Sequence, residues 1–431
     1  MQPGTSGSGF FFMLSLASPS GVTNPKATLD GFVFPWVFGF DTVHCLVTTS
    51  VQSLHGVCGV RTIPAPCLSR CGILYPAEGT RWKELVLIYT MTLNPALDYV
   101  MHPLTLDMGY TNRSSSEELY CGGNGINIST LLNELNVVNV AMGIVAGFTG
   151  VYLINELQEA GIASNFVKLD RGYTRINVKL NGIVMTMVNG MGPKIPEKKV
   201  DELLDRMDVL QAGDTLVLTG SIPNSLPEDM YNQIMARLAG RGIQFVVDAP
   251  GQLLMESIKA HPFLIKPNNH EVGRIFKADP MPETPEDCLP YAQKLQEGGA
   301  RNVIVSCGGN GSLLLDEYGT AHMVPTARVR LVNATGAGDS MVAGFLAKVT
   351  HGMDYENALI YASACGTATA ASKGIAKRST IDRVVTALYK KMGREMPASI
   401  ADDIKNEKAF AEAQALTAEG NGGEKQSSEA E

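Results

Sequence analysis

The segment Asn333–Ser340 reads N-A-T-G-A-G-D-S and runs directly into Met341–Ala347, an apolar stretch with helical spacing. Small residues before such a stretch predict a glycine loop at a helix start, where unpaired backbone N–H groups and the helix dipole favour an anion. A phosphate site beside a carboxylate base is what phosphoryl transfer to a hydroxyl needs. We therefore predict Asp339 as the general base, and as donors to the transferred group the backbone N–H groups of Gly336, Ala337 and Gly338.

By itself, a glycine-rich turn before a helix is a weak signal, because such turns are common. The best-known nucleotide motifs do not add to it. The chain has no G-x-x-x-x-G-K-[ST] loop, and no G-x-G-x-x-G opens a strand–helix–strand unit. The interpretation therefore depends on further motifs along the chain.

Composition limits the class of protein. The chain has 431 residues, of which 45% are hydrophobic and 18% charged, enough for one large α/β core or two smaller ones. Its formal charge of −8 argues against a general nucleic-acid binder, and no apolar stretch is long enough to span a bilayer. We expect a cytoplasmic protein with free thiols at the cysteines that follow residue 87, which lack metal-ligand spacing: Cys121, Cys288, Cys307 and Cys365.

Residues 1–86 differ from the rest, being rich in Ser, Thr, Gly, Pro and Cys with no lasting helical or strand period. Met1–Gly9 carries no positive side chain ahead of the apolar Phe10–Leu16, which is unlike a secretory signal. We expect residues 1–86 to be a non-native or disordered extension. One hypothesis is an over-extended reading frame, with the true start codon encoding Val86 or Leu87; the DNA sequence tests it.

After this segment, strand and helix patterns alternate, which predicts a mainly parallel sheet covered by helices on both faces. Thr174–Leu180 and Ile183–Val188 alternate polar and apolar residues around a turn, which is a hairpin signal. Neither this hairpin nor Tyr99–Tyr120 fits the parallel sheet. The expected boundaries are 87–397 for the α/β domain, about 99–121 and 173–190 for a small β-sheet lid within it, and 398–431 for an acidic, largely disordered tail.

Further motifs, in order, resemble the ribokinase-type (PfkB) family of sugar kinases over about residues 87 to 393. The resemblance implies a three-layer α/β sandwich with a small β-sheet lid. Asp98 ends the motif T-L-N-P-A-L-D and resembles the group that accepts hydrogen bonds from sugar hydroxyls. The motif G-G-N-G-I-N follows, and its glycines let the backbone approach a ligand closely. By this resemblance it supplies three substrate-binding residues: Gly122, Gly123 and Asn127.

One position departs from the family pattern. The family usually has Lys where this chain has Asn124, which removes a positive charge near the bound sugar phosphate. We expect weaker affinity for the substrate without loss of activity.

Arginines are the expected ligands of the sugar phosphate, because Arg suits bidentate binding of phosphate. In T-R-I-N-V-K-L the strand period places Arg175, Asn177 and Lys179 on one face. Arg175 and the upstream Arg113 resemble the family's phosphate ligands, whereas we expect Lys179 to lie on a solvated strand face. Ser221, in L-T-G-S-I-P, resembles a further sugar contact.

Later motifs resemble the nucleotide side of the family's site. In K-P-N-N-H-E, Lys266 and Asn268 resemble cofactor-binding residues, and Glu271 resembles the residue that holds Mg²⁺ with its phosphates, through water. Cys307, in S-C-G-G-N-G, is expected to be a small apolar filler. The remaining cofactor-binding residues implied by the resemblance are Ser306, Gly308, Gly311, Thr335 and Gly338.

The resemblance implies an enzyme that uses ATP and Mg²⁺. Within the resemblance, the residues of several motifs favour fructose 1-phosphate as substrate. It would be phosphorylated at its 6-hydroxyl to fructose 1,6-bisphosphate. Tagatose 6-phosphate and fructose 6-phosphate stay open as alternatives, since the sequence does not fix which end of the sugar carries the phosphate. A silent sugar-phosphate sensor is disfavoured because Asp339 and Glu271 are both present. The resemblance also implies a homodimer through the lid, with no nucleic-acid or membrane partner.

Overall fold

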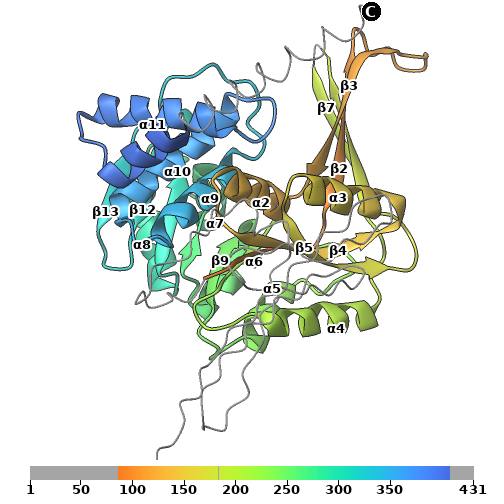
Figure 1. The fold of residues 1–431 in the computed structure, drawn as a ribbon, viewed down its shortest axis with the longest axis horizontal. Coiled ribbons are helices and arrows are strands. Elements are labelled where there is room, and N and C mark those ends of the chain that lie inside the picture. Colours follow the sequence, from red (N-terminus) through yellow and green to blue (C-terminus); the bar gives the residue numbers. More distant parts are fainter. Residues whose placement is uncertain (1–85, 183, 408–431) are drawn as a thin grey trace, which may run out of the picture. The chain divides into compact units, whose positions relative to one another are not determined.

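A nine-stranded sheet forms the centre of the described part of the chain, which covers residues 86–182 and 184–407 of the computed structural model (Figure 1). The strand order is β13-β12-β11-β10-β9-β8-β1-β4-β5. Pairing is parallel from β5 to β11 and antiparallel from β11 to β13. The strands are β1 (Ile88–Thr92), β4 (Asn139–Ala146), β5 (Ala163–Leu169), β8 (Thr215–Thr219), β9 (Gln244–Asp248), β10 (Leu264–Ile265), β11 (Asn302–Ser306), β12 (Ser312–Leu315) and β13 (Ala321–Val324).

Helices cover both faces of this sheet because its strands are apolar on both sides. In β8, Val217 belongs to one buried cluster, whereas Leu216 and Leu218 belong to another. The first face carries α2 (Asn124–Glu134), α3 (Gly147–Glu159), α9 (Ala337–Val349), α10 (Tyr355–Ala370) and α11 (Arg378–Met392) (Figure 1). The second carries α4 (Glu197–Arg206), α5 (Met230–Arg237), α6 (Gly251–Ser257), α7 (Asn269–Phe276) and α8 (Pro285–Glu297). The predicted three-layer arrangement is confirmed.

A separate four-stranded sheet, here called the small sheet, has the order β3-β2-β6-β7. The chain enters it directly from the large sheet, since only Leu93–Pro95 separates β1 from β2. Its central strands pair in parallel, with Asp98 opposite Asn177, and β6 and β7 form the predicted hairpin. Its strands are β2 (Ala96–Pro103), β3 (Ser114–Gly122), β6 (Arg175–Asn181) and β7 (Met185–Asn189).

The described region continues past the boundary that we expected at residue 397. Residues 398–407 are helical, and Ile400 and Ile404 are buried in the cluster that contains α9 to α11. We expected residues 398–431 to be a largely disordered tail; this first stretch of it is helical, because two apolar residues four apart give it a face to bury. The rest of that prediction, and the prediction for residues 1–85, lie outside the described residues. No helix in the described ranges has the length and apolarity needed to cross a membrane.

Candidate active site

The carboxylate of Asp339 lies in the first turn of α9 and is almost fully buried. Oδ2 accepts a hydrogen bond from Nδ2 of Asn127 at 2.7 Å, and Oδ1 accepts one from Nδ2 of Asn124 at 3.0 Å. Both amides come from the first turn of α2, so the carboxylate sits between two helix N-termini, whose dipoles favour a negative charge. The helix N-cap, Gly336, has a φ of +81°, a conformation that favours glycine.

The surroundings of Asp339 set its basicity. Burial raises the pKa of Asp339 to about 6, and the nearby charge of Asp248 raises it as well. The amide of Asn127, the charge of Lys266 and the amide of Asn124 act in the opposite direction. A carboxylate with this pKa is mostly ionised at pH 7 yet takes up a proton more readily than an ordinary Asp, which suits a general base.

Lys266 follows β10 and lies against the glycine loop. A Cβ added at Gly338 would lie 2.9 Å from its Nζ, so a larger residue would require the lysine to shift. Nζ is 3.3 Å from Oδ2 of Asp248. Burial lowers the pKa of Lys266, but the carboxylates of Asp248, Asp339 and Glu271 outweigh it, so the pKa is raised. Lys266 is therefore a charged group placed beside the predicted phosphate site.

Asp248 is the site residue that the sequence interpretation missed. It ends β9, at the carboxyl edge where α/β sheets bind ligands. That position was the available signal, since a polar residue at the end of a buried parallel strand points to a site. Burial raises the pKa of Asp248, and the charge of Lys266 opposes this shift.

Asn268 and Glu271 form a capping box at the start of α7. The side chain of Asn268 accepts the N–H of Glu271 at 2.9 Å, and Oε2 of Glu271 accepts the N–H of Asn268 at 2.8 Å. The N-x-x-E spacing signals this cap in the sequence, and we had interpreted it only as ligand binding. In the role predicted for Glu271, its second carboxylate oxygen would accept a water of Mg²⁺. A single carboxylate acting through water fits the preference of that ion.

The loop that follows β11 owes its shape to two glycines. Gly308 has a φ of +52° and Gly311 a φ of +112°, and a Cβ at Gly311 would lie 2.4 Å from the carbonyl oxygen of Val324. Ser306 lies beside Asn268 through a parallel bridge. Cys307 is buried, with its Sγ 3.6 Å from that of Cys288. The expected free thiols are confirmed for Cys121, Cys288, Cys307 and Cys365.

On the small sheet, both carboxylate oxygens of Asp98 have partners. Oδ1 accepts from Nδ2 of Asn177 and Oδ2 from Nζ of Lys179, both at 2.7 Å. The side chain of Lys179 is only 12% exposed, so the expectation of a solvated lysine was wrong. The parallel register of β2 and β6 brings these residues together. A Cβ at Gly122 would lie 2.9 Å from the Asp98 carboxylate, so the glycine leaves room for it.

The two predicted phosphate-binding arginines lie far apart along the small sheet. Nε of Arg175 donates to the carbonyl oxygen of Asn94 at 3.1 Å, and burial lowers the pKa of Arg175. Arg113 is exposed and directly precedes Ser114, the first residue of β3, which pairs with Pro103. Asp98 instead pairs with Tyr120, near the last residue of β3. Within one chain Arg113 therefore lies away from Asp98, and its predicted contact with the sugar phosphate stays a prediction.

The glycine segment Gly122–Asn127 connects the two halves of the site. Asp98 borders it at Gly122, and Asp339 is bonded to it at Asn124 and Asn127. Ser221 is exposed and follows Gly220, where an added Cβ would lie 3.0 Å from Oδ1 of Asn124. Thr335 is exposed in the loop before α9, and its N–H donates to the side chain of Asn333 at 3.0 Å. Loops distant in sequence thus meet around one segment.

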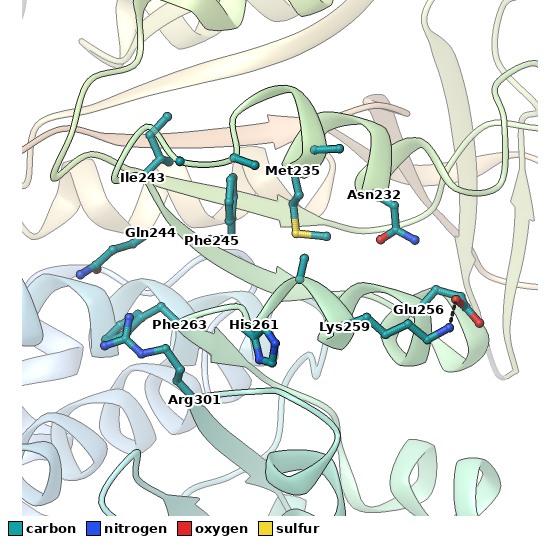
Figure 2. A pocket seen from close by; sticks show the side chains of 14 residues that line it. Asn232, Met235, Ile243, Gln244, Phe245, Glu256, Lys259, His261, Phe263 and Arg301 are labelled. Atoms are coloured by element: carbon teal, nitrogen blue, oxygen red, sulfur yellow. Dashed lines mark hydrogen bonds and ion pairs between the residues drawn. The ribbon is translucent and has the colours of Figure 1, made fainter.

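A cavity of about 450 Å³ lies elsewhere, at the amino ends of the strands (Figure 2). Gln244 at the start of β9, His261 and Arg301 before β11 line it, and Figure 2 shows the Lys259–Glu256 ion pair at its side. The carboxyl edge, not this edge, is where such sheets bind ligands. Within the described ranges, no three His, Cys, Asp or Glu side chains gather in a group suited to a metal ion.

A family model described as pfkB family carbohydrate kinase matches residues 91–381. The chain belongs to this family. As a pfkB family carbohydrate kinase, it transfers a phosphoryl group to a hydroxyl group of a sugar. The family predicted from the sequence motifs is thus confirmed.

Relatives and solved structures agree with this assignment. The 1-phosphofructokinase of Bacillus subtilis is 40% identical over 299 residues, covering 69% of this chain and 97% of that protein. The D-tagatose-1-phosphate kinase of Bacillus licheniformis is 33% identical over 302 residues, covering 70% of this chain and 98% of that protein. Two more distant structures show the same fold, each over 70% of this chain and 99% of theirs: Escherichia coli phosphofructokinase-2 (24% identity, TM-score 0.66) and Thermotoga maritima ribokinase (20%, TM-score 0.57).

The pair of Lys266 and Asp248, whose side chains are 6% and 14% exposed, gives a pH-dependent prediction for stability. Lys266→Met leaves Asp248 buried without its cation, so we expect the free energy of unfolding to fall by about 3–5 kcal/mol at pH 8. Burial already raises the pKa of Asp248 in the folded state, and loss of Lys266 raises it further. The folded variant then holds a proton that the unfolded chain releases, so its stability falls as pH rises above the ordinary Asp range. Urea unfolding should show a smaller loss at pH 5 than at pH 8.

Lys259→Met is the matched control, because Lys259 is 67% exposed and pairs at the surface with Glu256. It should change stability by less than about 1 kcal/mol at both pH values. Equal losses for Lys266→Met at pH 5 and pH 8 would contradict the assignment of Asp248 as its charge partner.

Proposed function

We propose that this kinase phosphorylates fructose 1-phosphate at the 6-hydroxyl with ATP and Mg²⁺, giving fructose 1,6-bisphosphate. The relative with 40% identity is named for this substrate. The observation that carries the proposal is the Asp339 carboxylate, bonded to the same glycine segment that borders Asp98. Asp98 holds the sugar hydroxyls, and Asp339 takes the proton from the hydroxyl that attacks the γ-phosphoryl group.

The proposed roles of the other residues follow from their positions. The backbone N–H groups at the start of α9 and the ammonium of Lys266 stabilise charge on the transferred group. Arg175 and Lys179 lie on the same small sheet as Asp98 and balance the charge of the sugar phosphate. Glu271 would hold Mg²⁺ through water, and the ion would neutralise charge on the ATP phosphates when bound.

Tagatose phosphates are the main alternative substrates. The relative with 33% identity is named for D-tagatose 1-phosphate, and tagatose differs from fructose in the configuration at one carbon. Asp98 contacts the hydroxyls in our proposal, and Asn177 and Lys179 hold its carboxylate in place. This cluster would therefore discriminate between the two sugars.

A side-by-side substrate panel tests the proposal. We expect kcat/KM for fructose 1-phosphate to exceed by about tenfold or more that for D-tagatose 1-phosphate, tagatose 6-phosphate and fructose 6-phosphate, since a misplaced hydroxyl leaves buried polar groups unpaired. Coupled ADP release measures each rate. A higher kcat/KM for any other sugar would overturn the substrate assignment, and binding without turnover of any would indicate a silent sensor.

Replacing the proposed base tests the mechanism separately. Asp339→Asn should reduce kcat by roughly 10²–10⁴-fold, the usual contribution of a general base. Binding of ATP and of fructose 1-phosphate, measured by calorimetry, should change little, because the amide is nearly the same size. Asp208→Asn, at an exposed surface position, is the control and should retain full turnover. Near-normal kcat in Asp339→Asn would remove this residue from the base role.

We further propose that two chains pair through their small sheets. Cross-strand pairing puts Tyr120 on the face that carries Asp98, and Met187 on the face that carries Lys179. Tyr120, Met185 and Met187 are all exposed. Exposed apolar side chains beside the proposed substrate site favour a covering partner, and β3 and β7 are the edge strands of the small sheet among the described residues.

Met185→Lys should weaken this dimer by about tenfold or more, because the dimer would bury a charge. It should also raise KM for the sugar phosphate, since the site closes less well. Sedimentation measures the dimer, and Val209→Lys, exposed after α4, serves as the control. A monomer at all concentrations, or a dimer indifferent to Met185→Lys, would refute pairing through the small sheet.

A further inference from the structure

We propose that Asn124 is a positioning residue for the transfer step, one that orients the Asp339 carboxylate toward the sugar hydroxyl through the hydrogen bond from Nδ2 to Oδ1. This inference rests on the proposed function, because it takes Asp339 as the base. It assigns to Asn124 a role in orienting the base, in place of the weaker phosphate binding that its sequence position suggested.

The two amides that bind Asp339 come from one turn of one helix. Asn124 and Asn127 are three residues apart at the start of α2, so their side chains lie on the same face. Each donates to a different oxygen, at 3.0 and 2.7 Å. A carboxylate held by one donor can still turn about its last side-chain bond, whose torsion is broad. Two donors on two oxygens fix both its position and its orientation.

The two amide donors to Asp339 differ in exposure. Asn127 is half-buried, whereas Asn124 is exposed. Its other side-chain atom, Oδ1, lies close to Gly220, where an added Cβ would be 3.0 Å away. Gly220 precedes Ser221, the predicted sugar contact. The amide therefore links the base to the loop on the sugar side, where the acceptor hydroxyl must arrive. Each Asp339 oxygen still has an acceptor site for that hydroxyl, because a carboxylate can accept about four hydrogen bonds.

The charges around Asp339 explain why a neutral amide suits this position. Asp248 at the end of β9 and Lys266 after β10 both act on it, and Glu271 of α7 acts on Lys266. Helix α10, which packs along α9, contributes the hydroxyl of Thr369 to Ser340, and α2 contributes the two amides. A lysine at 124 would add an ammonium and make the carboxylate a weaker base. Asn124 orients the carboxylate without adding charge.

Two substitutions with opposite effects test the inference, assayed with ATP and fructose 1-phosphate from pH 5 to pH 9. Asn124→Leu removes the donor, so the acid limb of kcat/KM, expected near pH 6, should move to higher pH by about half to one unit. At its plateau kcat should fall about tenfold, with KM changed less than about threefold. Asn124→Lys should move the acid limb to lower pH. Asn133→Leu, near the other end of α2, should not move it.

The outcomes separate this inference from the proposed function. A fall in kcat/KM that is equal at every pH, or a limb that moves the same way in both variants, would overturn the role of Asn124. If thermal melting shows that Asn124→Leu is unfolded, the direction of the shift in Asn124→Lys decides. Full turnover in Asp339→Asn would instead overturn the base assignment itself. An inactive Asp339→Asn together with an unmoved limb in both Asn124 variants would refute only the inference.

Discussion

The burial of the Asp339 carboxylate is the constraint on which the site depends. A buried anion is costly unless hydrogen bonds and charges compensate it. Here the compensation comes from the first turns of α9 and α2 and from Lys266, which belong to three separate parts of the chain. The parallel sheet makes this possible, because it brings strand ends and helix starts to one edge. The same burial raises the pKa of Asp339 to about 6, so the cost in stability accompanies the raised basicity that the proposed base role needs.

Much of this arrangement follows from local sequence patterns. Glycines before an apolar helix predicted the start of α9, and alternating residues predicted the β6–β7 hairpin. Asp339 and Asn127 were expected in one site from their motifs, and they are hydrogen-bonded. These features could be predicted because glycine conformations and strand periods are properties of a few adjacent residues.

The features that were missed depend on contacts between distant segments. The position of Asp248 at a strand end was a local signal, but its pairing with Lys266 is specified by no local pattern. The same holds for the pairing of Lys179 with Asp98. The position of Arg113 depends on the register of β2 and β3, which the sequence does not give. The capping box at Asn268 was different, since its N-x-x-E signal is local and was simply given another interpretation.

The carboxylates of the site divide into two kinds by their partners. Asp98 and Asp248 each lie beside the ammonium of a lysine with little exposure, so each pair is close to neutral and can stand beside an anionic substrate. Asp339 is instead hydrogen-bonded to neutral amides, with Lys266 acting on it only through space. A carboxylate whose charge a bonded cation compensates suits holding a ligand, whereas one supported by dipoles keeps its affinity for a proton. The ammonium beside them distinguishes Asp98 and Asp248 from Asp339, since Asp98 also accepts an amide, that of Asn177. In the proposed mechanism, Asn124 belongs to the part that keeps Asp339 a base.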